Sequence, residues 1–167
     1  VEEHLVEASE YAVCRGQEVH LHFTVSPEHQ PKFESHVSEI KESYQKKYGI
    51  VINVNYSIQK PSTDTIAVDM QNAPFREEDG SLLFRPAGHG ALLESLNEIA
   101  ADLIFIKNID NVVPDHLKLE TVIYKKVIAG VLVETQEKIF NYIQKLNEDG
   151  SDELLIEIKA FAEQHLG

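Results

Sequence analysis

RPAGHG at residues 85–90 and KNIDN at residues 107–111 are two short loops around which the rest of the chain is organised. We call these two segments the glycine loop and the N-I-D-N loop. Residues 91–101 between them carry apolar side chains at helical spacing, which predicts a short helix. Residues 102–106 (DLIFI) form an apolar run that follows Asp102, which predicts a buried strand. The N-I-D-N loop would then follow the carboxyl end of that strand, where open α/β sheets bind their ligands.

The residues before the glycine loop alternate between helical and strand patterns. Residues 1–13 have the spacing of an amphipathic helix, and residues 19–25 alternate with period two, as a strand does. Ser26, followed by proline, is expected to cap a helix that ends at Gly49. Residues 50–58 are rich in β-branched side chains and predict a second strand. This succession favours a parallel sheet with helices on its faces.

A short hairpin is expected ahead of the glycine loop. Residues 65–69 have the composition of a short strand, and Glu78-Asp79-Gly80 has that of a hairpin turn. The turn would place residues 73–76 against residues 81–84. The second strand of the hairpin then leads directly into the glycine loop.

The last third of the chain has only helical patterns. Pro114 is suited to begin a helix, and apolar residues keep helical spacing beyond it. Ser151 is expected to cap the final helix. The sequence therefore predicts an α/β core over residues 1–113 and an extension of two or three helices over residues 114–167.

Composition excludes several classes of partner. The chain has 167 residues, of which 43% are hydrophobic and 26% charged, which is ordinary for a globular protein. A net charge of −13 disfavours nucleic acids and anionic membranes as partners. One cysteine, Cys14, excludes an internal disulfide and indicates a reducing compartment, so we expect a cytoplasmic protein. The glutamates of residues 1–13, Glu7 among them, are expected to face solvent.

The two loops together resemble a known enzyme class. The pair Gly88-His89-Gly90 and Asn108-Ile109-Asp110-Asn111, with an apolar helix and strand between, is similar to the uridylyltransferases of the UDP-sugar pyrophosphorylase class. The stretch from residue 64 to Pro114 is also similar to an uncharacterised bacterial family grouped with these nucleotidyltransferases. The resemblance implies a Rossmann-like nucleotidyltransferase fold. It also implies transfer of a uridylyl group from a nucleoside triphosphate to a sugar 1-phosphate.

The resemblance assigns roles to individual residues. Gly88 and Gly90 would let the backbone approach the nucleobase, and His89 would hydrogen-bond the nucleotide or the sugar phosphate. Asp110 would bind Mg²⁺ or the ribose, which makes it and His89 the candidate catalytic residues. Asn108 and Asn111 would shape the turn or reach the sugar.

The same residues also permit simpler interpretations. His89 and Asp110 have the chemistry of helix caps. Arg85 and Lys107 have the charge to meet a phosphate or to pair with glutamates. Histidines such as His20 and His22 share a strand face, but no cysteine or carboxylate completes a familiar zinc spacing.

The chain also departs from the enzyme class that it resembles. The glycine-rich loop with its triphosphate-binding arginine, and the lysine after it, are missing from the chain. The strands and the second metal carboxylate expected beyond the N-I-D-N loop are replaced by helices. We therefore expect the middle of a nucleotidyltransferase, incomplete at both ends and inactive alone. The alternative is a non-catalytic domain that binds a nucleotide sugar or another protein.

Overall fold

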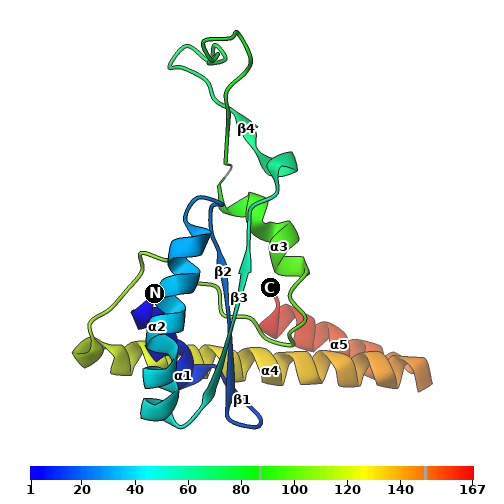
Figure 1. The fold of residues 1–167 in the computed structure, drawn as a ribbon. Coiled ribbons are helices and arrows are strands. Elements are labelled where there is room, and N and C mark those ends of the chain that lie inside the picture. Colours follow the sequence, from blue (N-terminus) through cyan, green and yellow to red (C-terminus); the bar gives the residue numbers. More distant parts are fainter. Residues whose placement is uncertain (87, 149) are drawn as a thin grey trace. The chain divides into compact units, whose positions relative to one another are not determined.

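The computed structural model describes residues 1–86, 88–148 and 150–167, with only the backbone given for His89. It contains two compact units, Val1–Asp115 and His116–Gly167. The first unit is a mixed α/β arrangement with a three-stranded and a two-stranded sheet. The described part of the second unit is helical. Figure 1 shows the course of the chain through these elements.

A parallel pair of strands forms the centre of the first unit. The sheet consists of β1 (Val13–Cys14), β2 (Glu18–Thr24) and β3 (Val51–Ser57), in that order. β2 and β3 pair in parallel along their whole length, from Glu18 opposite Val51 to Thr24 opposite Ser57. β1 adds a short antiparallel pairing at the start of β2. The predicted parallel pair is thus confirmed.

Helix α1 (Glu2–Tyr11) closes the hydrophobic core of this unit. Its Leu5 is wholly buried, as are Val19 of β2 and Ile52 of β3. Burial of such side chains stabilises the unit by about 1.5 to 3 kcal/mol each. The core therefore fixes α1 to the sheet.

Helix α2 (Gln30–Tyr48) connects the two parallel strands. The prediction that Ser26 caps this helix is wrong, since His29 is at the cap position. The helix begins four residues after Ser26, because the Ser26 carbonyl accepts hydrogen bonds from His29 N (3.0 Å) and Gln30 N (3.1 Å) in a preceding turn. It ends as predicted at Gly49, whose φ of 66° lies in the left-handed region that glycine adopts without strain.

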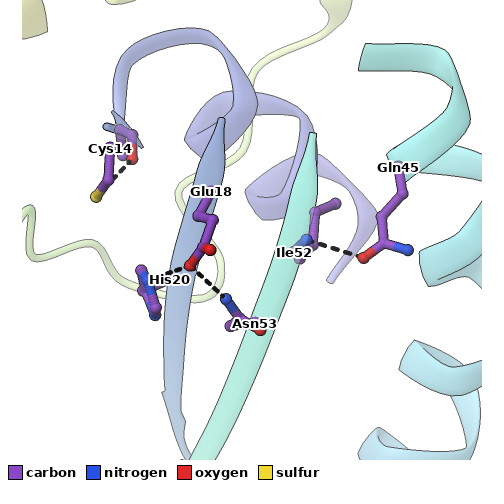
Figure 2. A network of polar contacts seen from close by, with 7 residues as sticks. Cys14, Glu18, His20, Gln45, Ile52 and Asn53 are labelled. Atoms are coloured by element: carbon purple, nitrogen blue, oxygen red, sulfur yellow. Dashed lines mark hydrogen bonds and ion pairs between the residues drawn. The ribbon is translucent and has the colours of Figure 1, made fainter. Parts of the chain in front are cut away.

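Polar contacts at the amino ends of the strands fasten this crossover (Figure 2). The Gln45 side chain accepts a hydrogen bond from the Ile52 backbone N at 2.9 Å, which ties the end of α2 to the start of β3. Glu18 accepts from the Asn53 amide at 3.4 Å and lies 3.5 Å from His20 Nε2.

The predicted hairpin is present ahead of the glycine loop. β4 (Thr65–Ile66) pairs antiparallel with β5 (Phe84–Arg85), and isolated bridges join Val68 to Pro74 and Arg76 to Leu82. At the tip, Gly80 N donates to Glu77 O at 3.0 Å. A short helical turn, η1 (Pro61–Thr63), joins β3 to this hairpin.

The segment between the two loops differs from the prediction. The helical part consists of η2 (His89–Leu92) and α3 (Leu93–Asn97), shorter than the predicted residues 91–101. The structure assigns no strand to residues 102–106, and Ile106 is 67% exposed. The prediction of a buried strand is wrong, and the contacts described below give the reason.

The second unit is an αα arrangement that follows η3 (Asp115–Leu117). Helix α4 (Lys118–Glu148) is continuous through Gly130, and α5 (Asp152–His165) follows it. Ser151 caps α5 as predicted, its hydroxyl accepting from Leu154 N. Tyr142 of α4 donates to Glu157 of α5 at 2.9 Å. Of the helices in the described residues, none combines the length and the apolar character that a bilayer crossing requires.

Candidate functional site

One face of α1 holds the segment that leads into the N-I-D-N loop. His4, Glu7 and Tyr11 are spaced by three and four residues and therefore share a helix face. Each contacts one of the alternate residues 109, 107 and 105, so this segment runs antiparallel to the helix. Alternate contacts are typical of an extended chain. The segment is held by a helix, which explains why it adds no strand to the sheet.

The central contact is a buried ion pair between Lys107 Nζ and Glu7 Oε1. The Glu7 side chain is 1% exposed and that of Lys107 is 17% exposed. The second Glu7 oxygen accepts a hydrogen bond from the Tyr11 hydroxyl at 3.1 Å. The prediction that Glu7 faces solvent is therefore wrong. Of the two possibilities for Lys107, pairing with a glutamate is the one observed.

Tyr11 completes this cluster through both its ring and its hydroxyl. Its ring meets that of Phe105 edge-on, with centroids 4.9 Å apart. Burial raises the pKa of the Tyr11 phenol well above its ordinary value of 10.0, and the charge and hydrogen bond of Glu7 raise it further. The phenol is therefore held as a neutral donor to the carboxylate.

The raised pKa of Tyr11 predicts a loss of stability in alkali. Because the pKa is higher in the folded state than in the unfolded state, the contribution of Tyr11 is complete below about pH 10 and is lost as pH rises above it. Thermal unfolding at a series of pH values from about 8 to 11 is the measurement. We expect Tyr11→Phe to show a shallower alkaline decline than the unaltered protein. Equal declines would contradict the role given to the hydroxyl.

The N-I-D-N loop lies toward the carboxyl ends of the parallel strands. His4 Nε2 hydrogen-bonds the carbonyl oxygen of Ile109 at 3.0 Å, and the His4 ring meets that of Phe23 edge-on at 6.2 Å. Phe23 is the next-to-last residue of β2 and pairs with Tyr56 of β3. The loop was expected to follow a strand over residues 102–106, but its position depends on contacts with α1 instead.

The helix after the glycine loop also lies near this edge. Lys60, three residues beyond the end of β3, pairs with Glu98 at 2.6 Å and with Glu94 of α3 at 3.4 Å. The hydrogen bonds that the Lys60 ammonium donates to the carboxylates of Glu98 and Glu94 raise the pKa of Lys60. Figure 1 shows α3 beside the carboxyl end of β3. The N-I-D-N loop and the helix that follows the glycine loop thus lie toward the same edge, although the contacts described for each do not include the other.

The glycines of the first loop have no evident structural requirement in the described part of the chain. Gly88 and Gly90 are exposed, and a Cβ added to either would meet no described atom within 4 Å. Neither has a positive φ. Arg85 is exposed at the end of β5, where its carbonyl oxygen accepts from the Thr65 hydroxyl at 3.5 Å. The His89 side chain lies outside the described residues.

The polar side chains of the second loop are exposed. Asn108, Asp110 and Asn111 form a tight turn in which Asn111 N donates to Asn108 O at 3.2 Å and Val112 N donates to Asp110 O at 2.9 Å. The described residues contain no group of three or more histidine, cysteine or acidic side chains that could hold a metal ion. A magnesium ion at Asp110 would therefore be coordinated by this one carboxylate, by water and by the bound substrate.

The sequence interpretation missed His4, Glu7 and Tyr11. The sequence feature that could have indicated a shared helix face is the spacing of these three residues, by three and four positions, beside the apolar stripe of α1. Glutamates are usually solvated, so that spacing alone did not separate Glu7 from its neighbours.

The fold defines a mixed α/β protein with a parallel strand pair, and the N-I-D-N loop and helix α3 lie toward the carboxyl ends of these strands. The chain belongs to the family described as Domain of unknown function (DUF4301), whose model matches residues 1–167. Neither the curated proteins nor the solved structures include a match to it.

Proposed function

We propose that the chain forms part of a Rossmann-like nucleotidyltransferase that transfers a uridylyl group from a nucleoside triphosphate to a sugar 1-phosphate. The nucleotide would bind between the glycine loop and the N-I-D-N loop. One observation carries the proposal: the N-I-D-N loop and the helix α3 that follows the glycine loop both lie toward the carboxyl ends of β2 and β3. Ligands of open α/β sheets bind at that edge.

The two glycines of the glycine loop are an argument for a nucleobase bound against this loop. Glycine is needed where φ is positive or where another group approaches the backbone closely. At Gly88 and Gly90 the described chain supplies neither reason. A nucleobase lying against the loop would supply the second, and the backbone groups and His89 would then orient it.

The side chains of the N-I-D-N loop have the chemistry to bind a metal ion and a sugar. Asp110 offers an exposed carboxylate, and magnesium ions at phosphates commonly use only one or two protein carboxylates. Asn108 and Asn111 would direct amide groups to the ribose or the sugar. Since Lys107 is paired with Glu7, Arg85 is the stronger candidate for a phosphate contact. In a chain of net charge −13, Mg²⁺ would supply the remaining charge neutralisation.

Binding of UDP tests the site directly. We expect calorimetry to detect UDP binding in the presence of Mg²⁺. Gly90→Val should weaken it at least about tenfold, because a branched side chain would occupy the base position; that factor corresponds to about 1.4 kcal/mol. Asp110→Asn should remove its dependence on Mg²⁺. Asp152→Asn, an exposed aspartate at the start of α5, is the matched control. Absence of UDP binding, or equal effects of the two aspartate variants, would refute the proposed site.

Turnover separates an enzyme from a binding domain. Release of pyrophosphate from UTP should be followed with a panel of sugar 1-phosphates and the full-length protein. Turnover that is lost in Asp110→Ala would support the transferase. UDP binding without turnover of any substrate would instead support the non-catalytic alternative, a domain that binds a nucleotide sugar.

A further inference from the structure

We infer that Glu7 and Lys107 are positioning residues that hold the N-I-D-N loop in the arrangement that binds nucleotide. This inference rests on the proposed function, and it adds residues of α1 to the determinants of that site. It starts from the ion pair, in which a 1% exposed carboxylate on α1 meets the lysine directly before Asn108.

The loop depends on this contact because a β-ladder does not hold it. In an ordinary α/β edge, the residues after a strand are placed by the hydrogen bonds of that strand. Residues 102–106 belong to none of the strands, so the following loop is located by side-chain contacts with α1. Glu7 is the centre of those contacts, since Lys107 and Tyr11 each bond one of its oxygens.

α1 is a suitable anchor because it is itself fixed. Its Leu5 and Ala8 lie in the same core cluster as Val19 and Ile52. One turn of α1 before Glu7, His4 holds the Ile109 carbonyl. The pair and the His4 contact therefore link the turn at Asp110 to the most buried part of the unit.

Positioning and direct phosphate binding by Lys107 give opposite expectations for Glu7→Gln. Glu7 is 1% exposed, so it is expected to act through the residues that it holds. If the pair positions the loop, neutralising Glu7 lowers the fraction of molecules with a competent loop and weakens binding. If Lys107 were a phosphate ligand restrained by Glu7, its release would strengthen binding.

The experiment combines UDP titration with hydrogen exchange on the same variants. We expect Glu7→Gln to raise the Kd for UDP about tenfold, as when about a tenth of the molecules keep a competent loop. Exchange of the amide hydrogens of Asn111 and Val112 should become faster, because both close the turn. Lys107→Arg, which keeps the cation, should stay close to the unaltered protein in both measurements. Glu134→Gln, which neutralises the exposed pair with Lys138, is the control and should change neither.

Three results would overturn the inference. Unchanged exchange at Asn111 and Val112 would show that the pair does not hold the loop. Faster exchange with an unchanged Kd would show that the loop is held for another purpose, and tighter binding would assign Lys107 to the ligand. Failure of the proposed function is separate, because the unaltered protein would then bind no UDP.

Discussion

Lys107→Met is expected to lower the free energy of unfolding of the Val1–Asp115 unit by about 3 to 5 kcal/mol, the usual cost of removing one partner of a buried ion pair. The substitution leaves the Glu7 carboxylate buried without a cation. The remaining Tyr11 hydrogen bond does not offset the lost charge interaction. The expected loss is a large share of the stability of a small unit.

Urea unfolding followed by circular dichroism measures this loss, with amide exchange assigning it to the unit concerned. The double variant Glu7→Gln/Lys107→Met removes both charges and should recover most of the stability, because it buries no unpaired charge. Lys138→Met breaks the exposed pair with Glu134 and should cost at most about 1 kcal/mol. Equal losses in Lys107→Met and Lys138→Met would contradict the buried pair.

Leu5→Ala is expected to cost about 3 to 5 kcal/mol. Leu5 is wholly buried in the cluster that joins α1 to both parallel strands, and truncation would leave a cavity in that contact. The neighbouring backbone belongs to a helix and a sheet, so it has little freedom to close the cavity. Loss of this contact also loosens the anchor on which Glu7 lies.

The same unfolding measurement tests this prediction. Met70→Ala is the control, since Met70 is 93% exposed in the same unit and its truncation should change stability by at most about 0.5 kcal/mol. Leu5→Ala should also speed amide exchange at Val112, because α1 carries the loop contacts. A cost below about 1 kcal/mol for Leu5→Ala would show that α1 does not close the core.

Local signals account for the elements that could be predicted. Alternating apolar residues predicted β2, and the β-branched run predicted β3. Gly49 ended α2 because its backbone conformation suits glycine, and Ser151 capped α5 because its hydroxyl reaches a free backbone N–H. The hairpin at Gly80 followed from the same kind of turn chemistry. Each of these depends on residues close together in the chain.

The candidate site was less accessible to sequence reasoning. The two loops and their residues were found from composition and resemblance. What holds the second loop was not found, because Glu7 and Lys107 are 100 residues apart. A short continuous apolar run fits a buried strand as well as an extended segment against a helix, and residues 102–106 form neither a helix nor a strand.

Propensity, capping and apolar periodicity act over a few residues, and they were enough to predict the strands β2 and β3, the crossover helix, the hairpin and the helical end. The alternation of strands and helices indicated that β2 and β3 pair in parallel. The burial of Glu7, its pairing with Lys107 and the contacts of the N-I-D-N loop with α1 could be found only in the folded structure. The physical reason is that a buried charge is tolerated only when folding brings its counter-charge to it. That pairing depends on the packing of α1 against the sheet, which no local pattern encodes.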